Sequence, residues 1–435
     1  MQIWLRNTIY LAALLLASPW IAYRAVRTGR YLRSWRQQLF GLRPASGVPA
    51  VHGRRIWLHG VSVGEVQLLK PLWEALSREN PECQFALSTT TETGMELAAK
   101  CYPESVQKFY FPLDFSWAVG RTLKTLKPSL IVLGELEVWP NLIDMAAHHD
   151  IPLVVVNGRL SDRSFRGYRR FHRWTEPIFS KLNLVAAQSE TYAQRFIECG
   201  TPAERVETTG SFKFDNVAFE RDTPEVRQLR ELVGLTPGHR VWVVGSTQAG
   251  EELPACQAFA VARQHEPALR LIVVPRHKER FDEVAIDLQS TGLRVLRRSS
   301  LSQPGRPGSA SADWDVLLVD TIGELRWWWG TADLALVGGS FGKRGGQNML
   351  EPAAYGINVA FGPNTSNFRD IVGLLLAADA ATQLDSLEEI RPWLLRELAD
   401  PLPGKERGQR AQRLIAQQQG ALDRTVLCLQ KCLHK

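Results

Sequence analysis

Glu65 is the first residue whose type and position suggest acid–base chemistry. No Asp or Glu precedes it, and it follows a short apolar run, residues 56–59, and a turn bracketed by Gly60 and Gly64. This pattern predicts a strand, a tight turn and a helix that begins near Glu65. A carboxylate at the carboxyl end of a strand lies where α/β sheets bind ligands, and it could act as a general base. The alternative is a first-turn Glu that only stabilises its helix through the helix dipole.

Two further carboxylates and a lysine follow later strands of the first half. Glu135 and Glu137 come directly after the apolar run 130–133, and Pro140 then favours the start of a helix. We expect the turn to separate the two side chains, so that only one faces the crevice; alternatively, both are solvated turn acids. Lys213 is predicted to be a fixed cation near the crevice, placed to meet a carboxylate or a leaving phosphate, unless it is a simple surface lysine.

The second half carries the candidates for nucleotide binding. Arg276 follows the apolar run 271–274 and is well placed to grip a phosphate. A glycine-rich stretch, residues 338–346, precedes a predicted helix, so its backbone amides and the helix N-terminus could bind an anion. Asn348 and Glu351 are three residues apart on one face of that helix, and Glu351 could accept hydrogen bonds from ribose hydroxyls. The stretch matches neither the P-loop nor the dinucleotide-binding fingerprint.

Other chemistry-bearing patterns are weak. The nine histidines show no metal-ligand spacing and the six cysteines no disulfide framework, so we expect no metal, no cofactor and a reducing compartment. Asp313 and Asp315 resemble a metal-binding D-x-D pair, but they precede a predicted strand instead of ending one. The tryptophan run 327–329 is better explained by packing than by stacking on a base.

Alternating apolar runs and helical patterns predict the elements that position these residues. Such alternation is typical of parallel sheets, so we expect an α/β protein with two doubly wound halves that face a cleft. The expected strands are residues 56–59, 85–89, 130–133, 153–156 and 184–187, then 241–244, 271–274, 316–319, 334–337 and 357–361. Residues 43–50 and 299–313 read as loops. Residues 405–433 predict one long polar helix that packs back across the halves.

The N-terminus predicts a membrane anchor. Residues 8–23 are almost wholly apolar, and five arginines between residues 24 and 36 alternate with aromatic side chains. The apolar run is short for a span, so a short span or an interfacial helix is expected, with the basic flank on the cytoplasmic side. The net charge of +7 suits an anionic partner. We therefore expect an anchor over residues 1–42, an acceptor-binding domain over 48–216 and a donor-binding domain over 236–435.

Several of these stretches together resemble the successive motifs of the 3-deoxy-D-manno-octulosonic acid (Kdo) transferases of lipopolysaccharide synthesis. The resemblance covers nearly the whole chain. The motifs are HGVSVGE (59–65), ELEVWPN (135–141), GSFKFD (210–215), PRH (275–277), GEL (323–325) and GGSFGKRGGQNMLE (338–351).

The resemblance implies a two-domain GT-B fold and transfer of Kdo from CMP-Kdo to a lipid A precursor at the cytoplasmic face of the inner membrane, without a metal. It implies Glu65 as the general base, with Glu135 and Lys213 stabilising the transition state and the anomeric centre inverted. It implies that CMP is held by Pro275, Arg276, Ile322, Gly323, Glu324, Asn348, Met349, Leu350 and Glu351. Nucleic acid is not an expected partner.

One departure from the family pattern concerns the first strand end of the second half. Family members often have a His after Ser-Thr, where this chain has Gln248. A ligand contact at this position is therefore not implied. The rival interpretations are another GT-B nucleotide-sugar enzyme and a non-catalytic, membrane-tethered protein that binds a CMP-sugar.

Overall fold

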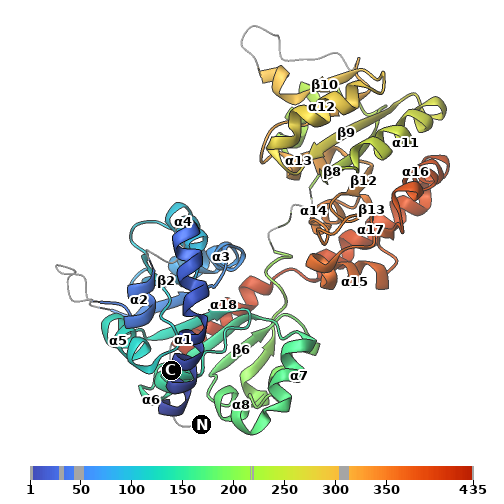
Figure 1. Cartoon of the computed structure of the whole chain (residues 1–435). Helices are drawn as coiled ribbons and strands as arrows, with labels where there is room; N and C mark the ends of the chain where they lie inside the picture. Colours follow the sequence, from blue (N-terminus) through green and yellow to red (C-terminus); the bar gives the residue numbers. More distant parts are fainter. Residues whose placement is uncertain are drawn as a thin grey trace. The chain divides into compact units, whose positions relative to one another are not determined.

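The structure is a computed structural model with two α/β units (Figure 1). It describes residues 3–28, 34–43, 53–215, 217, 220–302 and 313–433. The first unit contains Met1–Asp215 and Gln419–Lys435, and the second contains Asn216–Gln418. Most of the two expected loops, residues 44–50 and 303–312, and part of the basic segment, residues 29–33, lie outside the described residues.

The first unit is built on a seven-stranded sheet whose paired strands are all parallel. Its order is β3-β2-β1-β4-β5-β6-β7. Because β1 lies beside β4, the direction of winding reverses between these two strands. The strands are β1 (Arg55–His59), β2 (Gln84–Thr89), β3 (Gln107–Tyr110), β4 (Leu130–Gly134), β5 (Leu153–Gly158), β6 (Leu184–Ala187) and β7 (Val206–Thr208).

Helices cover both faces of this sheet. On one face Ile56 and Leu58 pack with the apolar side of α3, and on the other Trp57 packs with residues of α5 and α6. This explains why the strands read as continuous apolar runs, since neither face meets water. The helices before β7 are α1 (Ile3–Thr28), α2 (Trp35–Phe40), α3 (Val63–Glu79), α4 (Glu92–Cys101), α5 (Ser116–Leu126), α6 (Pro140–His148), α7 (Asp162–Arg170), α8 (His172–Phe179), α9 (Glu190–Glu198) and the 3-10 helix η1 (Ala203–Arg205).

Helix α1 is fastened to the first unit at its beginning and exposes apolar side chains further on. Arg6 forms an ion pair with Asp144, and Asn7 Nδ2 donates to Ser116 Oγ at 2.7 Å. Farther along α1, Leu16 is 85% exposed. Within the described ranges, no helix combines the length and apolar character needed to cross a membrane.

The predicted C-terminal helix is in fact two helices, α17 (Pro401–Gln417) and α18 (Ala421–Leu433). The expectation of one continuous helix is wrong because Gly420 adopts φ +82°, which ends the helical path before α18. Val426 and Leu429 of α18 pack in the same core cluster as α3, so α18 belongs to the first unit.

The second unit has a seven-stranded sheet in the order β10-β11-β9-β8-β12-β13-β14, again with parallel pairing. Here the reversal of winding lies between β8 and β12. The strands are β8 (Arg240–Thr247), β9 (Leu269–Pro275), β10 (Val295–Arg297), β11 (Val316–Leu318), β12 (Leu334–Val337), β13 (Asn358–Phe361) and β14 (Thr382–Gln383).

Two residues of the tryptophan run are buried in the second unit. Trp328 and Trp329 are buried, and the Trp329 ring lies so close to Gly245 of β8 that a Cβ there would approach it to 2.5 Å. The packing role predicted for these tryptophans is confirmed for two of the three. The α-helices are α10 (Pro224–Leu232), α11 (Glu252–His265), α12 (Phe281–Gln289), α13 (Leu325–Thr331), α14 (Leu350–Ala354), α15 (Arg369–Ala377) and α16 (Ile390–Ala399), with 3-10 helices η2 (Lys278–Arg280), η3 (Arg298–Ser302), η4 (Ser366–Phe368) and η5 (Leu387–Glu389).

Candidate active site

The candidate catalytic residues of the first unit gather at the carboxyl edge of its sheet. Glu65 follows β1, and Glu135 follows β4, the strand paired with β1. Ligands of doubly wound folds bind where adjacent strands lead to opposite faces, and this point lies between β1 and β4. Glu65 and Glu135 follow two adjacent strands, and both therefore lie at the predicted ligand-binding crevice.

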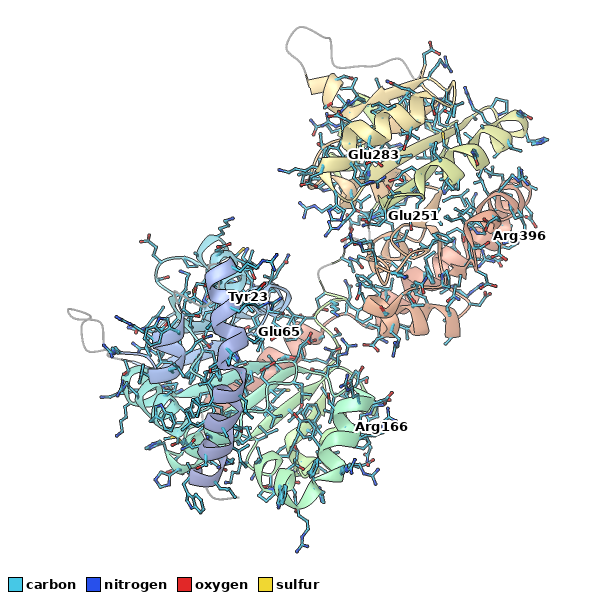
Figure 2. All side chains as sticks on the ribbon, in the orientation of Figure 1. Tyr23, Glu65, Arg166, Glu251, Glu283 and Arg396 are labelled. Atoms are coloured by element: carbon cyan, nitrogen blue, oxygen red, sulfur yellow. The ribbon has the colours of Figure 1, made fainter. Side chains whose placement is uncertain are left out.

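Glu65 is fixed by the first turn of its own helix. Ser62 caps α3 and its Oγ accepts a hydrogen bond from the Glu65 amide at 3.3 Å. In return, Glu65 Oε2 accepts from the Val61 amide at 2.7 Å, and Oε1 accepts from Ser62 Oγ at 3.1 Å. Figure 2 labels this half-buried side chain in the first unit. Glu65 thus stabilises its helix, as the alternative interpretation expected, and it also lies at the crevice.

Burial sets the acidity of Glu65. Removal from water raises the pKa of Glu65, the Val61 amide acts against this, and the charge of Glu135 raises it further. A raised pKa brings a carboxylate closer to the range in which a general base works at neutral pH.

The turn after β4 is strained and lies against the Glu65 carboxylate. Glu135 adopts φ +54°, and its amide donates to Val156 O at 3.0 Å. A Cβ on Gly134 would lie 3.9 Å from Glu65 Oε2. Asp114 fixes the far end of the turn, because its carboxylate accepts from the first amides of α6.

Glu137 joins this carboxylate cluster. Burial raises the pKa of Glu137 to about 8, and the charges of Glu65 and Glu135 contribute to the rise while the Trp139 side chain opposes it. Both Glu135 and Glu137 lie within electrostatic reach of Glu65, and the expectation that only one of them faces the crevice stays a prediction. A pKa near 8 favours the protonated form of Glu137 at neutral pH.

An aromatic stack lines the same edge of the sheet. His59, the last residue of β1, stacks on Phe111 with ring centroids 3.8 Å apart, and Phe111 contacts Trp139 at 5.0 Å. Burial lowers the pKa of His59 to about 3, so its imidazole is neutral. His59 is thus a core residue beside the carboxylates rather than an acid or base.

Lys213 sits in a turn that is anchored at both ends. The Phe212 amide donates to Asn157 Oδ1 at 3.2 Å, and Asn157, at the end of β5, adopts φ +52°. Asp215 accepts hydrogen bonds from Gly420, Ala421 and Leu422 at the start of α18. Lys213 itself is exposed at the edge that carries Glu65. In the described part of the chain, no ion pair joins Lys213 to Glu65 or Glu135.

Two site features escaped the sequence interpretation. The reciprocal bonds of Ser62 and Glu65 follow the S-x-x-E spacing of a capping box, which was visible in the sequence. Asn157 had no comparable signal, because its role depends on a left-handed backbone conformation at the strand end.

Three nucleotide-site candidates meet in the second unit. Asn348 Nδ2 donates to Glu351 Oε1 at 3.0 Å. Burial raises the pKa of Glu351, while Asn348 and the charges of Arg326 and Arg276 lower it, so Arg276 lies within electrostatic reach. Helix α14 begins at Leu350, so the expectation that Asn348 and Glu351 share a helix face is wrong. A direct hydrogen bond joins them instead.

The remaining candidates contribute mainly backbone. Pro275 ends β9, and the Arg276 amide donates to Thr247 O at 3.1 Å. Met349 and Leu350 are buried.

The segment 322–324 presents an exposed tip. Ile322 is exposed and Gly323 adopts φ +89°. The Glu324 carboxylate is bound internally, by Arg298 Nη2 at 2.9 Å and Thr321 Oγ1 at 2.8 Å. The backbone and the Ile322 side chain are therefore the parts of this segment left to contact a ligand.

The glycine-rich stretch does not offer all its amides to a ligand. Gly339 and Phe341 donate instead to the carboxylate of Glu251. Across the described ranges, no cluster of three His, Cys, Asp or Glu side chains is arranged to hold a metal.

Comparison with known proteins identifies relatives over almost the full length. Residues 33–216 match the family model of the 3-deoxy-D-manno-octulosonic-acid transferases (kdotransferases). The 3-deoxy-D-manno-octulosonic acid transferase of Haemophilus influenzae is 30% identical over 431 residues, with 98% of each chain covered. The enzyme of the same name from Bordetella pertussis is 33% identical over 422 residues, with 95% of each chain covered.

Solved structures support the fold class. The UDP-GlcNAc 2-epimerase of Neisseria meningitidis, bound to UDP-GlcNAc, aligns with a TM-score of 0.55 at 14% identity and covers 87% of this chain and 100% of that chain. A glycosyltransferase of Rickettsia africae aligns with a TM-score of 0.54 at 10% identity, covering 88% of this chain and 99% of that chain. At such identities the likeness concerns the fold alone. Together with the two parallel sheets, it confirms the predicted α/β, GT-B-like class.

Proposed function

This chain belongs to the family of Kdo transferases, and from that premise we propose that it moves Kdo from CMP-Kdo to a lipid A precursor with Glu65 as general base. As a family member it is a glycosyltransferase for Kdo. The donor, the acceptor and the base are the proposed parts. The observation that supports them best is the carboxylate cluster between β1 and β4, with Glu65 held at its centre by Val61 and Ser62.

The proposed reaction is a single displacement. Glu65 takes the proton of the acceptor hydroxyl, whose oxygen forms a bond to the anomeric carbon of Kdo. The bond from that carbon to the phosphate oxygen breaks, and its electron pair leaves with CMP. Attack on the face opposite CMP inverts the centre. The Glu135 carboxylate offsets positive charge that develops on the sugar, and Lys213 offsets negative charge on the leaving group.

The proposed CMP site lies in the second unit. Arg276 supplies a fixed positive charge for the single phosphate. Glu351, oriented by Asn348, accepts hydrogen bonds from the ribose hydroxyls. The exposed backbone at Ile322 and Gly323 and the Pro275 strand end complete the contacts.

The proposed place of action is the cytoplasmic face of the inner membrane. The first turns of α1 are bonded to the unit at Arg6 and Asn7, whereas farther along Leu15, Leu16 and Trp20 are exposed. Arg24 lies 4.6 Å above the Trp20 ring, a pairing suited to the headgroup level of a bilayer. This arrangement favours an interfacial helix whose apolar side chains enter the membrane surface.

A second basic surface supports a phosphorylated acceptor. Helix α7 and the start of α8 expose five arginines beside the stacked rings of Phe171 and Trp174, whose centroids are 5.9 Å apart (Figure 2, where Arg166 is labelled). Arginine guanidinium groups pair well with phosphates, and exposed aromatic rings suit the adjoining lipid. The arginines are Arg163, Arg166, Arg169, Arg170 and Arg173.

The decisive experiment is Kdo transfer from CMP-Kdo to a tetraacylated lipid A precursor, read out by product mass without added divalent metal. We expect wild type to form product and Glu65→Gln to lose about 10²- to 10⁴-fold in kcat, the usual contribution of a general base. The matched control is Glu92→Gln, which removes a first-turn carboxylate from α4 in the same unit.

The outcomes separate the parts of the proposal. Transfer by Glu65→Gln at the wild-type rate would refute the base assignment and leave the reaction standing. If wild type binds CMP but forms no product, the assignment of a lipid A precursor as the acceptor is refuted.

Membrane attachment is tested with vesicles. Leu16→Asp should weaken sedimentation with phosphatidylglycerol vesicles, because it places a charge where α1 would enter the bilayer. Leu402→Asp is the control, since Leu402 is 63% exposed on α17 of the other unit. Equal sedimentation of both variants with wild type would refute the role of α1.

A further inference from the structure

We propose that Glu251 is a specificity-determining residue that restricts the donor to a sugar linked to a nucleoside monophosphate, because its carboxylate occupies the place where a second phosphate would bind. The inference rests on the proposed function, since it takes a cytidine nucleotide as the ligand of the second unit. It adds a residue that lies outside the proposed CMP contacts and gives it a role in rejecting nucleoside diphosphates.

Glu251 lies at the point of the second sheet where phosphate is usually bound. It ends the loop between β8, the first strand of this unit, and α11. The neighbouring strand β12 leads into the glycine-rich stretch, so the carboxyl ends of β8 and β12 form the switch point. In doubly wound nucleotide-binding folds, backbone amides of the first strand–helix loop hold the phosphates at this place.

Here a side chain of the protein takes those amides. Glu251 Oε2 accepts from the Gln248 amide at 2.9 Å and from the Gly339 amide at 2.8 Å. Glu251 Oε1 accepts from Gly339 at 2.9 Å and, more weakly, from Phe341 at 3.4 Å. The three donors come from the loops after both switch-point strands. The carboxylate therefore sits in the nest of N–H groups as a bound anion would.

The Glu251 carboxylate is buried and lies directly against the backbone of Gly338. Glu251 is 3% exposed, and a Cβ on Gly338 would lie 2.6 Å from its Oε2. Figure 2 labels Glu251 in the second unit. Burial raises the pKa of Glu251, while the amide donors lower it by favouring the ionised form.

Arg280, a cation close to this loop, is already paired with a carboxylate. Arg280 binds the adjacent Glu252 with Nη1 at 2.7 Å and Nη2 at 3.2 Å, and Thr247 Oγ1 donates to the same carboxylate at 2.7 Å. A second phosphate at this point would thus lie beside the buried Glu251 carboxylate. The three amides would not be free to bind it, because they donate to Glu251, and Arg280 is paired with Glu252. A diphosphate would therefore meet like charge at this point, which weakens its binding relative to a monophosphate.

One phosphate can still bind. Arg276 lies beside this loop, since its amide donates to Thr247 O, and its charge reaches Glu351. A nucleoside monophosphate needs only this cation. The same residue that would exclude a diphosphate also ties the β8 loop to the glycine-rich stretch, so these two loops are held together before a ligand arrives.

The test is calorimetric titration of the full chain with CMP and with CDP. We expect wild type to bind CMP at least about tenfold more tightly than CDP, and Glu251→Gln to reduce this ratio about tenfold by removing the negative charge. The matched control is Glu252→Gln, which removes the neighbouring buried carboxylate, 2% exposed, that binds Arg280 instead of the amides. Its CMP-to-CDP ratio should stay at the wild-type value.

If the thermal transition shows that the variant does not fold, the comparison of CMP and CDP binding by wild type still tests the proposal. CDP binding by wild type as tight as that of CMP would overturn it, and so would an unchanged ratio in a folded Glu251→Gln or Glu251→Ala variant. Kdo transfer with either result would leave the proposed function intact. A wild type that binds neither nucleotide would instead overturn the proposed CMP site and this inference together.

Discussion

Glu137→Gln should remove a pH dependence of stability that the wild-type chain carries. The folded protein raises the pKa of Glu137 from its ordinary 4.5 to about 8. Between these values the folded state holds the proton and the unfolded state does not. Stability contributed by this group is therefore complete below pH 4.5 and is lost as the pH rises to 8.

The size of the loss follows from the shift. One pKa unit corresponds to about 1.4 kcal/mol, so the wild type should lose up to about 5 kcal/mol over this window, with a slope of about 1.4 kcal/mol per pH unit. Glutamine is neutral at every pH and resembles the protonated acid in shape. The Glu137→Gln variant should therefore lack this slope and should exceed wild type in stability at pH 8.

The assay is urea unfolding of the full chain at half-unit pH steps from 5 to 8.5, with wild type and variant compared at each step. The result is the difference in unfolding free energy between wild type and Glu137→Gln at each pH, in which the contributions of other titrating groups cancel. Glu92→Gln, an equal charge change in the first turn of α4, should run parallel to wild type. Parallel curves for wild type and Glu137→Gln would refute the assignment of the proton to Glu137.

Three further changes test other contacts. Ser62→Ala removes the cap of α3 and a partner of Glu65, so we expect a loss of about 1 kcal/mol in unfolding free energy together with a lower kcat; unchanged kcat would refute the orienting role. Asp215→Asn weakens three amide contacts and should speed hydrogen exchange at the start of α18, which unaltered protection would contradict. Arg276→Gln should raise the Kd for CMP at least about tenfold in titration calorimetry, whereas equal affinity would exclude Arg276 from the phosphate site.

The central strands could be predicted because both faces of each sheet are buried. The expected run 56–59 corresponds to β1 and 334–337 to β12, with end-points that agree to within one residue. A strand buried on both faces must be apolar at every position, and this leaves an uninterrupted signal. The edge strands β3, β7, β10 and β14 were not predicted, because they are short and most of their residues are only half-buried or exposed.

The candidate site was only partly predictable. The strand-then-turn pattern places Glu65 and Glu135 at one edge, since parallel strands share the direction of their carboxyl ends. The pattern could not show that Glu137 would join them, because this depends on the positive φ of Glu135. It also could not show that Glu251 would take the amides of the glycine-rich stretch, since that contact joins residues far apart in the sequence.

The placement of α18 has a consequence for the order in which the protein can fold during synthesis. The chain leaves the first unit at Asp215 and returns to it at Gln419, so the second unit is an insertion between two parts of the first. Ala421, Val426 and Leu429 fill the same core as α3 and β1. During synthesis of the second unit, the first unit therefore lacks α18. The apolar face that α18 covers is then exposed to water, where it can bind chaperones or aggregate. Deletion of α18 should destabilise the first unit, although α18 lies at the opposite end of the chain from the rest of that unit.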